Sequence, residues 1–181
     1  MSIAPVTFGP AWVMHNRFTA FVESSFKLSN NTTGRVWIFH NTAWTNQPNQ
    51  NGMSPFGDFE NLYFRNNIVR GTNYALEQSM RALPNDLDYD NLFTTRGAPV
   101  IKWSDTRYDT LADLCTATGL ECNAQPDDPQ AIDPANSRYA PGPASPNIDA
   151  AERLYGINDS FEGAGPDIGY VEAGAVEVPP L

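Results

Sequence analysis

Two stretches of the chain nearly repeat each other: Val36-Trp37-Ile38-Phe39-His40-Asn41-Thr42 and Leu62-Tyr63-Phe64-Arg65-Asn66-Asn67-Ile68. Each is a run of aromatic and β-branched residues that closes on an Asn. An earlier copy ends at Asn16, and a weaker, later copy ends at Asn91. The four closing asparagines stand at positions 16, 41, 67 and 91, so the steps between them are 25, 26 and 24 residues. A fixed period in this range is typical of a solenoid, in which successive coils stack on one another.

Asparagine suits the corner of such a coil. It tolerates left-handed backbone angles, and its side chain hydrogen-bonds to neighbouring backbone groups. Paired strands lie about 4.8 Å apart, so stacked coils would bring equivalent amides within bonding distance of one another, as in cross-β assemblies. The repeat therefore predicts an all-β parallel solenoid with about 25 residues per coil. The alternative is a set of unrelated strands that happen to end in Asn.

The remaining sequence is organised around these coils within a single domain, residues 1–181. Residues 11–93 are expected to form the coils. Residues 94–124 connect the coils to the tail and contain one short helix. Residues 125–181 are dense in Pro, Gly, Asp and Asn, which favour turns. We expect this tail to form an irregular strap that lies along the solenoid and covers its open end, because a bare last coil exposes unpaired edge groups.

The short helix is expected at residues 110–118. Asp109 or Thr110 can cap its first turn, Thr110 and Asp113 fit a capping box, and Gly119 follows its last residue. Cys115 lies within this helix and Cys122 lies behind it. Two cysteines at this spacing are not a metal signature, which would need a second pair or histidines. They either pair and tie the helix to the following segment or remain two free thiols.

The strand ends His40-Asn41-Thr42 and Arg65-Asn66-Asn67-Ile68 resemble the last coils of right-handed parallel β-helix proteins, the fold of many bacterial polysaccharide lyases. The tail is similar to the closing segment of that group in the following motifs: Asp128-Pro129 through Asp133-Pro134, Ser145-Pro146-Asn147-Ile148-Asp149, and Gly165-Pro166-Asp167-Ile168-Gly169 with Glu172. The resemblance covers roughly residues 35–172. It is specific for the fold and not for an activity, because members with different activities share the closing segment.

Two positions depart from the pattern of that group. The group usually has Gly where this chain has Ala151, and Ala where it has Tyr170, so the local turn geometry is open at both. The resemblance implies that the chain is the C-terminal part of a longer, secreted β-helix protein. Residues 1–22 lack the basic start and apolar block of a signal peptide. A solenoid that begins partway would also expose its first coil, through which the chain could self-associate.

The charge balance narrows the class of partner. The chain has 11 Lys and Arg against 21 Asp and Glu, a net charge of −10. This balance disfavours nucleic acid and anionic membranes, because phosphate groups are bound by Lys and Arg. The sequence contains no apolar run of about 20 residues, so no membrane-spanning helix is predicted. The expected partner is a glycan or a small-molecule substrate, and divalent cations are compatible with the negative charge.

Aligned on the closing Asn, the repeats place side chains in columns, and strand side chains alternate between the two faces. The column four positions before the Asn contains Trp12, Trp37, Tyr63 and Leu87, and the column two positions before it contains Met14, Phe39, Arg65 and Tyr89. Arg65 does not suit a narrow coil interior, so both columns are predicted to face outward. The rings of Trp12, Trp37 and Tyr63 would then form a platform for sugar rings. Alternatively, the strap or another chain covers them, or the faces are inverted and the rings are core.

Three residues are candidates for catalysis. His40 could act as an acid or a base, because histidine titrates near neutral pH, or it could simply bond to backbone. In lyase relatives of this fold, Ca²⁺ bridges a uronate carboxylate to the protein, and an Arg or Lys removes the proton alpha to that carboxylate. By this resemblance Arg65 is a candidate base and Lys102 a second one. No complete lyase site maps onto the chain.

The sequence Asp86-x-Asp88-x-Asp90 is the candidate metal site. Alternate carboxylates on a strand point to one side, where they would repel one another and raise each other's pKa. Ca²⁺ would relieve the repulsion, since it takes several oxygen ligands. The alternative is a set of solvated turn acids next to basic residues.

The sequence therefore favours a carbohydrate-active β-helix protein that binds or cleaves an acidic polysaccharide, with Ca²⁺ as its candidate cofactor. One alternative is a Ca²⁺-dependent hydrolase of a small ester or lactone, in which the metal polarises the carbonyl. Another is a non-catalytic structural or surface solenoid. Elimination would leave an unsaturated uronate, hydrolysis would release an acid, and a structural solenoid would turn over neither substrate.

Overall fold

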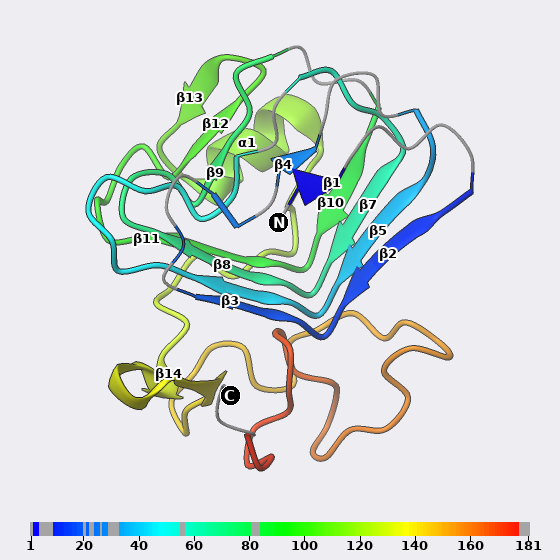
Figure 1. Ribbon diagram of the computed structural model, residues 1–181, viewed down its shortest axis with the longest axis vertical. Helices are drawn as coiled ribbons and strands as arrows, with labels where there is room; N and C mark the ends of the chain where they lie inside the picture. The colour runs from blue at the N-terminus through cyan, green and yellow to red at the C-terminus, as the bar shows by residue number, and fades with distance from the viewer. Residues whose placement is uncertain are drawn as a thin grey trace.

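The computed structural model is a parallel β-solenoid whose strands form two four-stranded sheets that meet at a corner (Figure 1). The first, which we call the aromatic sheet, contains in order β10 (Asp86–Asp88), β7 (Leu62–Arg65), β5 (Val36–Phe39) and β2 (Ala11–Met14). The second contains β11 (Asn91–Thr94), β8 (Ile68–Gly71), β6 (Thr42–Trp44) and β3 (Arg17–Thr19). The structure describes residues 2–3, 9–19, 21, 24–25, 27–28, 33–54, 57–80 and 84–177.

A third, smaller sheet closes the coils on the remaining side (Figure 1). In it β12 (Ile101–Trp103) lies between β9 (Leu76–Glu77), with which it is parallel, and β13 (Thr106–Tyr108), with which it is antiparallel. A further short parallel pair is formed by β1 (Ser2–Ile3) and β4 (Lys27–Leu28). The predicted parallel solenoid with coils of about 25 residues is therefore confirmed.

The corner between the two large sheets contains the expected ladder of side chains. Asn16 Nδ2 donates to Asn41 Oδ1 at 3.1 Å, and Asn41 Nδ2 donates to Asn67 Oδ1 at 2.9 Å. The fourth member is Asp90, whose Oδ1 accepts hydrogen bonds from the backbone and side-chain amides of Asn67. The sequence alignment had placed Asn91 in this column. It was wrong by one residue, because Asn91 pairs with Ile68 in the second sheet.

The left-handed residue at this corner is not the ladder residue itself. Positive φ angles occur one position earlier, at His15 (52°), His40 (49°), Asn66 (60°) and Tyr89 (59°). The left-handed turn at this position directs the side-chain amide of the next residue back over the preceding strand. Each buried Asn then bonds to a backbone carbonyl two residues before it, as Asn67 does to the carbonyl of Arg65. The ladder thus satisfies corner backbone groups that would otherwise be buried without partners.

The interior of the coils is apolar. One inward column of the aromatic sheet contains Val13, Ile38, Phe64 and Leu87, and each of these side chains is at most 3% exposed. With Leu87 in this column, the register also moves Asp86 into line with Tyr63. The rings of the neighbouring column therefore point away from the core, which settles the face assignment in favour of the outward orientation.

One helix, α1 (Leu111–Thr118), follows the coils, as predicted. Thr110 and Asp113 form the reciprocal capping box, and Gly119 ends the helix with a left-handed φ of 75°. Such caps satisfy amide and carbonyl groups that have no partner within a helix end.

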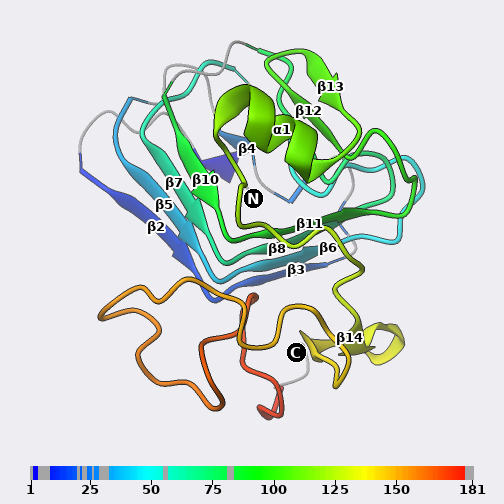
Figure 2. The ribbon, with the colours of Figure 1, turned by 180° about the vertical axis from the view of Figure 1, so that it is seen from behind.

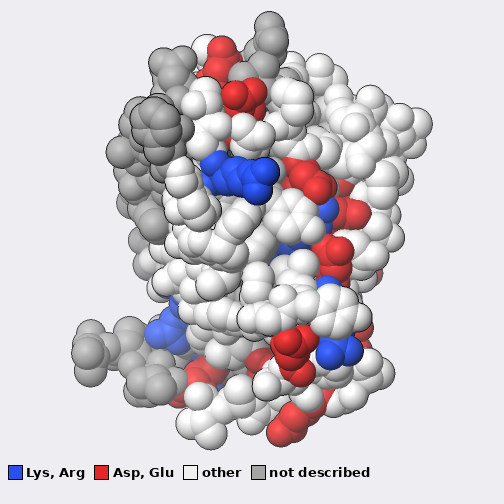
Figure 3. Space-filling model, turned by 90° about the vertical axis from the view of Figure 1, so that its right-hand side faces the viewer, with Lys and Arg blue, Asp and Glu red and all other residues white. Residues whose placement is uncertain are grey.

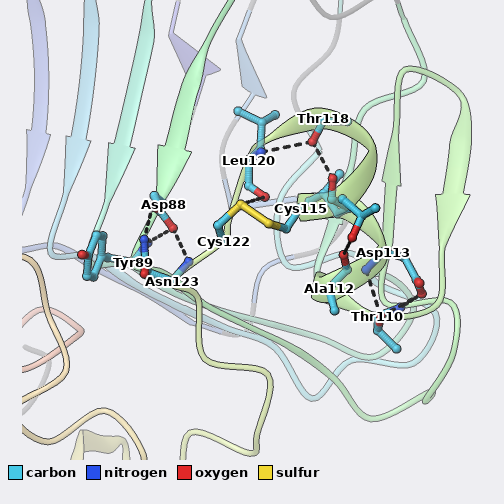
Figure 4. The surroundings of a disulfide bond; sticks show 12 residues. Asp88, Tyr89, Thr110, Ala112, Asp113, Cys115, Thr118, Leu120, Cys122 and Asn123 are labelled. Atoms are coloured by element: carbon cyan, nitrogen blue, oxygen red, sulfur yellow. Dashed lines mark hydrogen bonds between the residues drawn. A yellow bond between two sulfur atoms is a disulfide. The ribbon is translucent and has the colours of Figure 1, made fainter.

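The position of α1 differs from what the sequence suggested. It lies across the last coil and covers the interior at that end (Figure 2), with Leu111 and Leu114 packed into the solenoid core. Cys115 and Cys122 form a disulfide bond that ties α1 to the segment after it (Figure 4). The end of the solenoid is thus covered by this helix rather than by the tail.

The tail contains a small hairpin and is otherwise irregular. The hairpin consists of β14 (Ala131–Asp133), a 3₁₀ turn (Pro134–Asn136) and β15 (Arg138–Pro141). The tail runs along the outside of the corner between the two large sheets (Figure 1). Its backbone carbonyls contact one side chain from each of four successive coils: Arg17, His40, Asn66 and Asn91. The tail therefore runs along the solenoid from the first coil to the last, and the residues packed into the core at the last coil belong to α1.

No helix among the described residues is long and apolar enough to cross a membrane.

The ladder leads to a prediction about stability. Replacing Asn67 with Ala would remove, in a dry corner, the hydrogen bonds of its side chain to the carbonyls of Ile38 and Arg65 and to the backbone and side-chain amides of Asn41. We expect the free energy of unfolding, measured by urea denaturation, to fall by about 3 kcal/mol. Asn16→Ala, at the exposed end of the same ladder, should cost less than about 1 kcal/mol. Equal losses in the two variants would contradict a buried, cooperative ladder.

Candidate functional site

The aromatic column predicted from the sequence is present on the outer face of the aromatic sheet. Trp12 pairs with Trp37 and Trp37 with Tyr63, so the three rings follow one another across adjacent strands. Trp12 is 47% exposed, and the other two rings are half-buried. The Trp12 and Trp37 ring centroids lie 3.8 Å apart at an interplanar angle of 71°. The strap, which could have covered the rings, lies at the corner instead.

This face is hollowed beside the rings. One depression of about 350 Å³ is lined by Arg35, Trp37, Asn61, Leu62, Tyr63, Pro84, Asn85 and Asp86. A second of about 510 Å³ shares Arg35, Trp37 and Asn61 with the first. Figure 3 views this side of the molecule: uncharged groups cover most of its middle around a basic patch, and acidic groups lie at the top, along the right and at the bottom. The aromatic row and the two hollows together form the candidate site.

The exposed cation of this site, Arg35, was not singled out from the sequence. It directly precedes β5, and its equivalent in the next coil, Asn61, directly precedes β7. The same alignment that revealed the aromatic column contains both positions. They were missed because they lie in the turn, outside the aromatic run. Asn61 donates a hydrogen bond to the carbonyl of Thr33 at 2.7 Å, which fixes its amide at the rim.

Arg65, the candidate base, is held between two carboxylates. Its Nε donates to Glu152 of the tail at 2.9 Å, its Nη2 forms an ion pair with Asp86, and its Nη1 donates to the carbonyl of Phe64 at 2.9 Å. The guanidinium also lies over the ring of Tyr63, 4.4 Å from the centroid. Burial alone would lower the pKa of Arg65, but the hydrogen bond and charge of Asp86 outweigh it and raise the pKa. The structure thus shows Arg65 as a buried cation that joins tail and sheet.

His40 lies at the corner with both ring nitrogens engaged. Its Nδ1 is 3.2 Å from the carbonyl of Gly169, and its Nε2 is 3.1 Å and 2.8 Å from the side-chain amides of Asn66 and Asn158. The ring stacks on His15 with centroids 5.2 Å apart and an angle of 8°. These contacts define the neutral ring, in which Nδ1–H donates and Nε2 accepts from the two amides.

The environment of His40 strongly disfavours protonation. Burial is the main cause, and the charge of His15 adds to it, so the pKa of His40 falls to about 4. Protonation would also set an N–H against the two amide groups that now donate to Nε2. His40 therefore fastens the tail to the solenoid at neutral pH.

Lys102, the second candidate base, lies apart from these residues on β12 in the third sheet. Its ammonium group is 2.8 Å from Asp105 and 3.6 Å from Glu77. The structure does not bring Lys102 together with Arg65, His40 or the aromatic row.

The three carboxylates of the predicted metal site do not converge. Asp86 reaches Arg65 on the outer face, and Asp88 accepts hydrogen bonds from Asn123 at 2.7 Å (Figure 4). The left-handed Tyr89 then turns the chain, so Asp90 points into the ladder instead of alternating with the other two. Within the described part of the chain, no group of three His, Cys, Asp or Glu side chains is placed to hold a metal ion.

No family model, curated protein or solved structure matches this chain.

The contacts of His40 predict how stability depends on acid. Because the pKa of His40 is lower in the folded state than its ordinary value of 6.5, the contribution of the neutral ring is present above pH 6.5 and is lost toward pH 4. His40→Asn keeps a residue that tolerates the left-handed turn but does not titrate. We expect the difference in the free energy of unfolding between the wild type and this variant to shrink by about 1.4 kcal/mol per pH unit as the pH falls across that range.

Urea denaturation at a series of pH values would measure this change. His15→Asn keeps the same left-handed backbone and measures how much the neighbouring ring contributes, because the charge of His15 also lowers the pKa of His40. A constant difference between wild type and His40→Asn from pH 7 to pH 4 would show that the histidine does not titrate as described.

Proposed function

We propose that the protein binds an acidic polysaccharide along the outer face of the aromatic sheet. The observation that supports this proposal is the outward-facing row of exposed Trp12 and half-buried Trp37 and Tyr63, which lies beside two hollows lined in part by Arg35. Large apolar groups exposed together on a soluble surface commonly mark a binding site. The open, elongated shape of the face suits a chain-like ligand better than a small enclosed one.

The residues of the face match the chemistry of a uronate-containing glycan. The apolar face of a sugar ring packs against indole and phenol rings, which combine a large apolar surface with a polar edge. The exposed guanidinium of Arg35 lies on the wall shared by both hollows, where it can pair with a carboxylate in a bidentate manner. Asn61 and Asn85 add amide groups at the rim, which can contact hydroxyl groups.

Binding is better supported than cleavage. Arg65 and His40, the two candidates nearest the aromatic face, both hold the tail: Arg65 donates a hydrogen bond to Glu152, and His40 contacts Gly169 and Asn158. Neither is presented as a free base beside the rings. The lyase activity suggested by the resemblance remains a prediction, and an unsaturated uronate among the products would reveal it.

An extracellular location forms part of the proposal. The Cys115–Cys122 bond supports it, because disulfide bonds persist mainly in oxidising compartments. Acidic polysaccharides of cell walls and matrices are found in the same compartments.

Binding can be measured by the change in tryptophan fluorescence on titration with polygalacturonate, alginate and a neutral glucan. We expect saturable binding of an acidic polymer and at least tenfold weaker binding after Trp37→Ala. Arg35→Gln should weaken binding of the acidic polymer and leave any binding of the neutral glucan unchanged, because it removes only the partner of the carboxylate.

Matched controls lie on the tail. Tyr155→Ala removes a ring that is 81% exposed, and Arg153→Gln removes an exposed guanidinium from the same loop. Both should bind as the wild type does. Equal weakening by Tyr155→Ala and Trp37→Ala, or no binding of any glycan by the wild type, would argue for a structural solenoid instead.

A further inference from the structure

The row of rings on the aromatic sheet continues into an acid. On the last strand of this sheet, β10, the residue in register with Tyr63 is Asp86. From the first coil to the last, the row therefore consists of Trp12, Trp37, Tyr63 and Asp86. Neighbouring strands lie about 4.8 Å apart, so the row spans about 14 Å along the axis of the solenoid. A glycan bound along the row passes over three rings and then meets a carboxylate.

The charge of Asp86 is accessible to a ligand. Its side chain is 61% exposed and lines the smaller hollow, of about 350 Å³, although it is paired with Arg65. The side chain of Arg65 is only 8% exposed, and it also pairs with the carboxylate of Glu152. Two negative charges thus share one buried positive charge, so this end of the row is negative.

The accessible positive charge of the site lies nearer the middle of the row. Among the described residues, Arg35 is the only basic side chain that lines either hollow, and it lines both. It directly precedes β5, which lies two strands away from β10 in the sheet. One guanidinium binds one carboxylate well, through two parallel hydrogen bonds. The site therefore offers a partner to a single carboxylate.

We propose that this site selects an acidic glycan with sparse carboxylates, which places a uronate at Arg35 and an uncharged sugar at Asp86. The inference rests on the proposed glycan binding and specifies its ligand. A second uronate at Asp86 would bring like charges together, and such contacts disfavour a partner. An uncharged sugar instead donates its hydroxyl groups to the carboxylate of Asp86.

The two simpler kinds of glycan each fail at one end of the site. A polymer of uronates alone supplies a partner for Arg35 but is repelled at Asp86. A neutral glycan is accepted at Asp86 but leaves the guanidinium of Arg35 without a carboxylate. A glycan in which uncharged sugars separate the uronates satisfies both residues, and every sugar can pack an apolar face against the rings.

Polygalacturonate at three degrees of methyl esterification tests the inference, because each ester removes one charge and leaves the sugar backbone unchanged. Short chains of matched length, unesterified, half esterified or fully esterified, are titrated into the intact protein with a chelator present. Tryptophan fluorescence reports binding. We expect the half-esterified chains to bind about tenfold more tightly than the unesterified chains, because they avoid the repulsion at Asp86. They should bind about fivefold more tightly than the fully esterified chains, because they keep the partner of Arg35.

The three chains distinguish failure of the inference from failure of the proposed function. Tightest binding of the unesterified chains would overturn the inference and leave acidic glycan binding standing. Tightest binding of the fully esterified chains would overturn it as well, because Arg35 would then have no carboxylate to bind. If none of the three bound, the proposed function itself would fail, and the inference with it.

Two variants test whether the selectivity comes from the acidic end of the row. Asp86→Asn removes the accessible charge and should raise the affinity for unesterified chains about fivefold, with little change for half-esterified chains. Glu152→Gln removes the second acid without altering the lining of the hollows, and it should act in the same direction. Because the expected effect is a gain in affinity, a variant that folds poorly cannot imitate it. No gain in either variant would overturn the inference.

The net charge of −10 could also repel a polyanion, and Asp105→Asn controls for it. Asp105 is an acid with a 75% exposed side chain, and it pairs with Lys102 away from both hollows. Its replacement changes the net charge by the same amount as Asp86→Asn and should leave the affinity for all three chains unchanged. An equal gain in the two variants would assign the selectivity to net charge and overturn the inference.

Calcium provides a last discriminating condition, because a divalent cation could bridge Asp86 to a second uronate. Unchanged preference for the half-esterified chains after the chelator is replaced by Ca²⁺ is the result that supports the inference. If Ca²⁺ instead raised the affinity for unesterified chains to that of half-esterified chains, and did so only while Asp86 was present, a bound ion would occupy the acidic end. That outcome would overturn the inference.

Discussion

At the corner of each coil the chain turns while its backbone is buried. The fold depends on hydrogen-bond partners for the backbone amides and carbonyls that this turn would leave unpaired. The side chains of Asn16, Asn41 and Asn67 do so by donating to carbonyls of their own strand and by bonding to one another, and Asp90 accepts from Asn67 at the end of the row. Because each amide contacts the next coil, the ladder also fixes the register of the strands. A shift by one residue would move every side chain to the opposite face. The aromatic row outside and the apolar column inside are therefore both consequences of this corner.

The sequence predicted the solenoid because its period is visible in the spacing of chemically similar runs. The alignment of the repeats was wrong at the last coil, where Asp90 and Asn91 are adjacent in the sequence and either could continue the pattern. The apolar column decides between them, since only the register with Asp90 places Leu87 with Phe64 inside. The position of α1 over the last coil was not predicted either. Leu111 and Leu114 give α1 a short apolar face, which needs a surface such as the open end of the coils.

The candidate site was partly predictable. The three rings belong to the repeat itself, so alignment alone placed them in one column. The environments of Arg65 and His40 depend instead on Glu152, Asn158 and Gly169, residues of the tail that lie more than a hundred positions from His40 and some 87 from Arg65. No local sequence pattern indicates contacts between residues that lie so far apart in the chain. The burial of Glu121 was missed in the same way, because a left-handed turn outside the repeat directs its side chain inward.

The path of the tail has a consequence for cooperativity. In a simple solenoid each coil touches only its neighbours, so the coils can unfold one after another from an end. Here a single segment contacts Arg17, His40, Asn66 and Asn91 in turn and connects coils that do not otherwise meet. If one coil unfolded, the tail would lose its contact there, and its contacts with the other coils would be weakened. The tail thus converts a linear array of weakly coupled units into a domain that folds and unfolds as a whole.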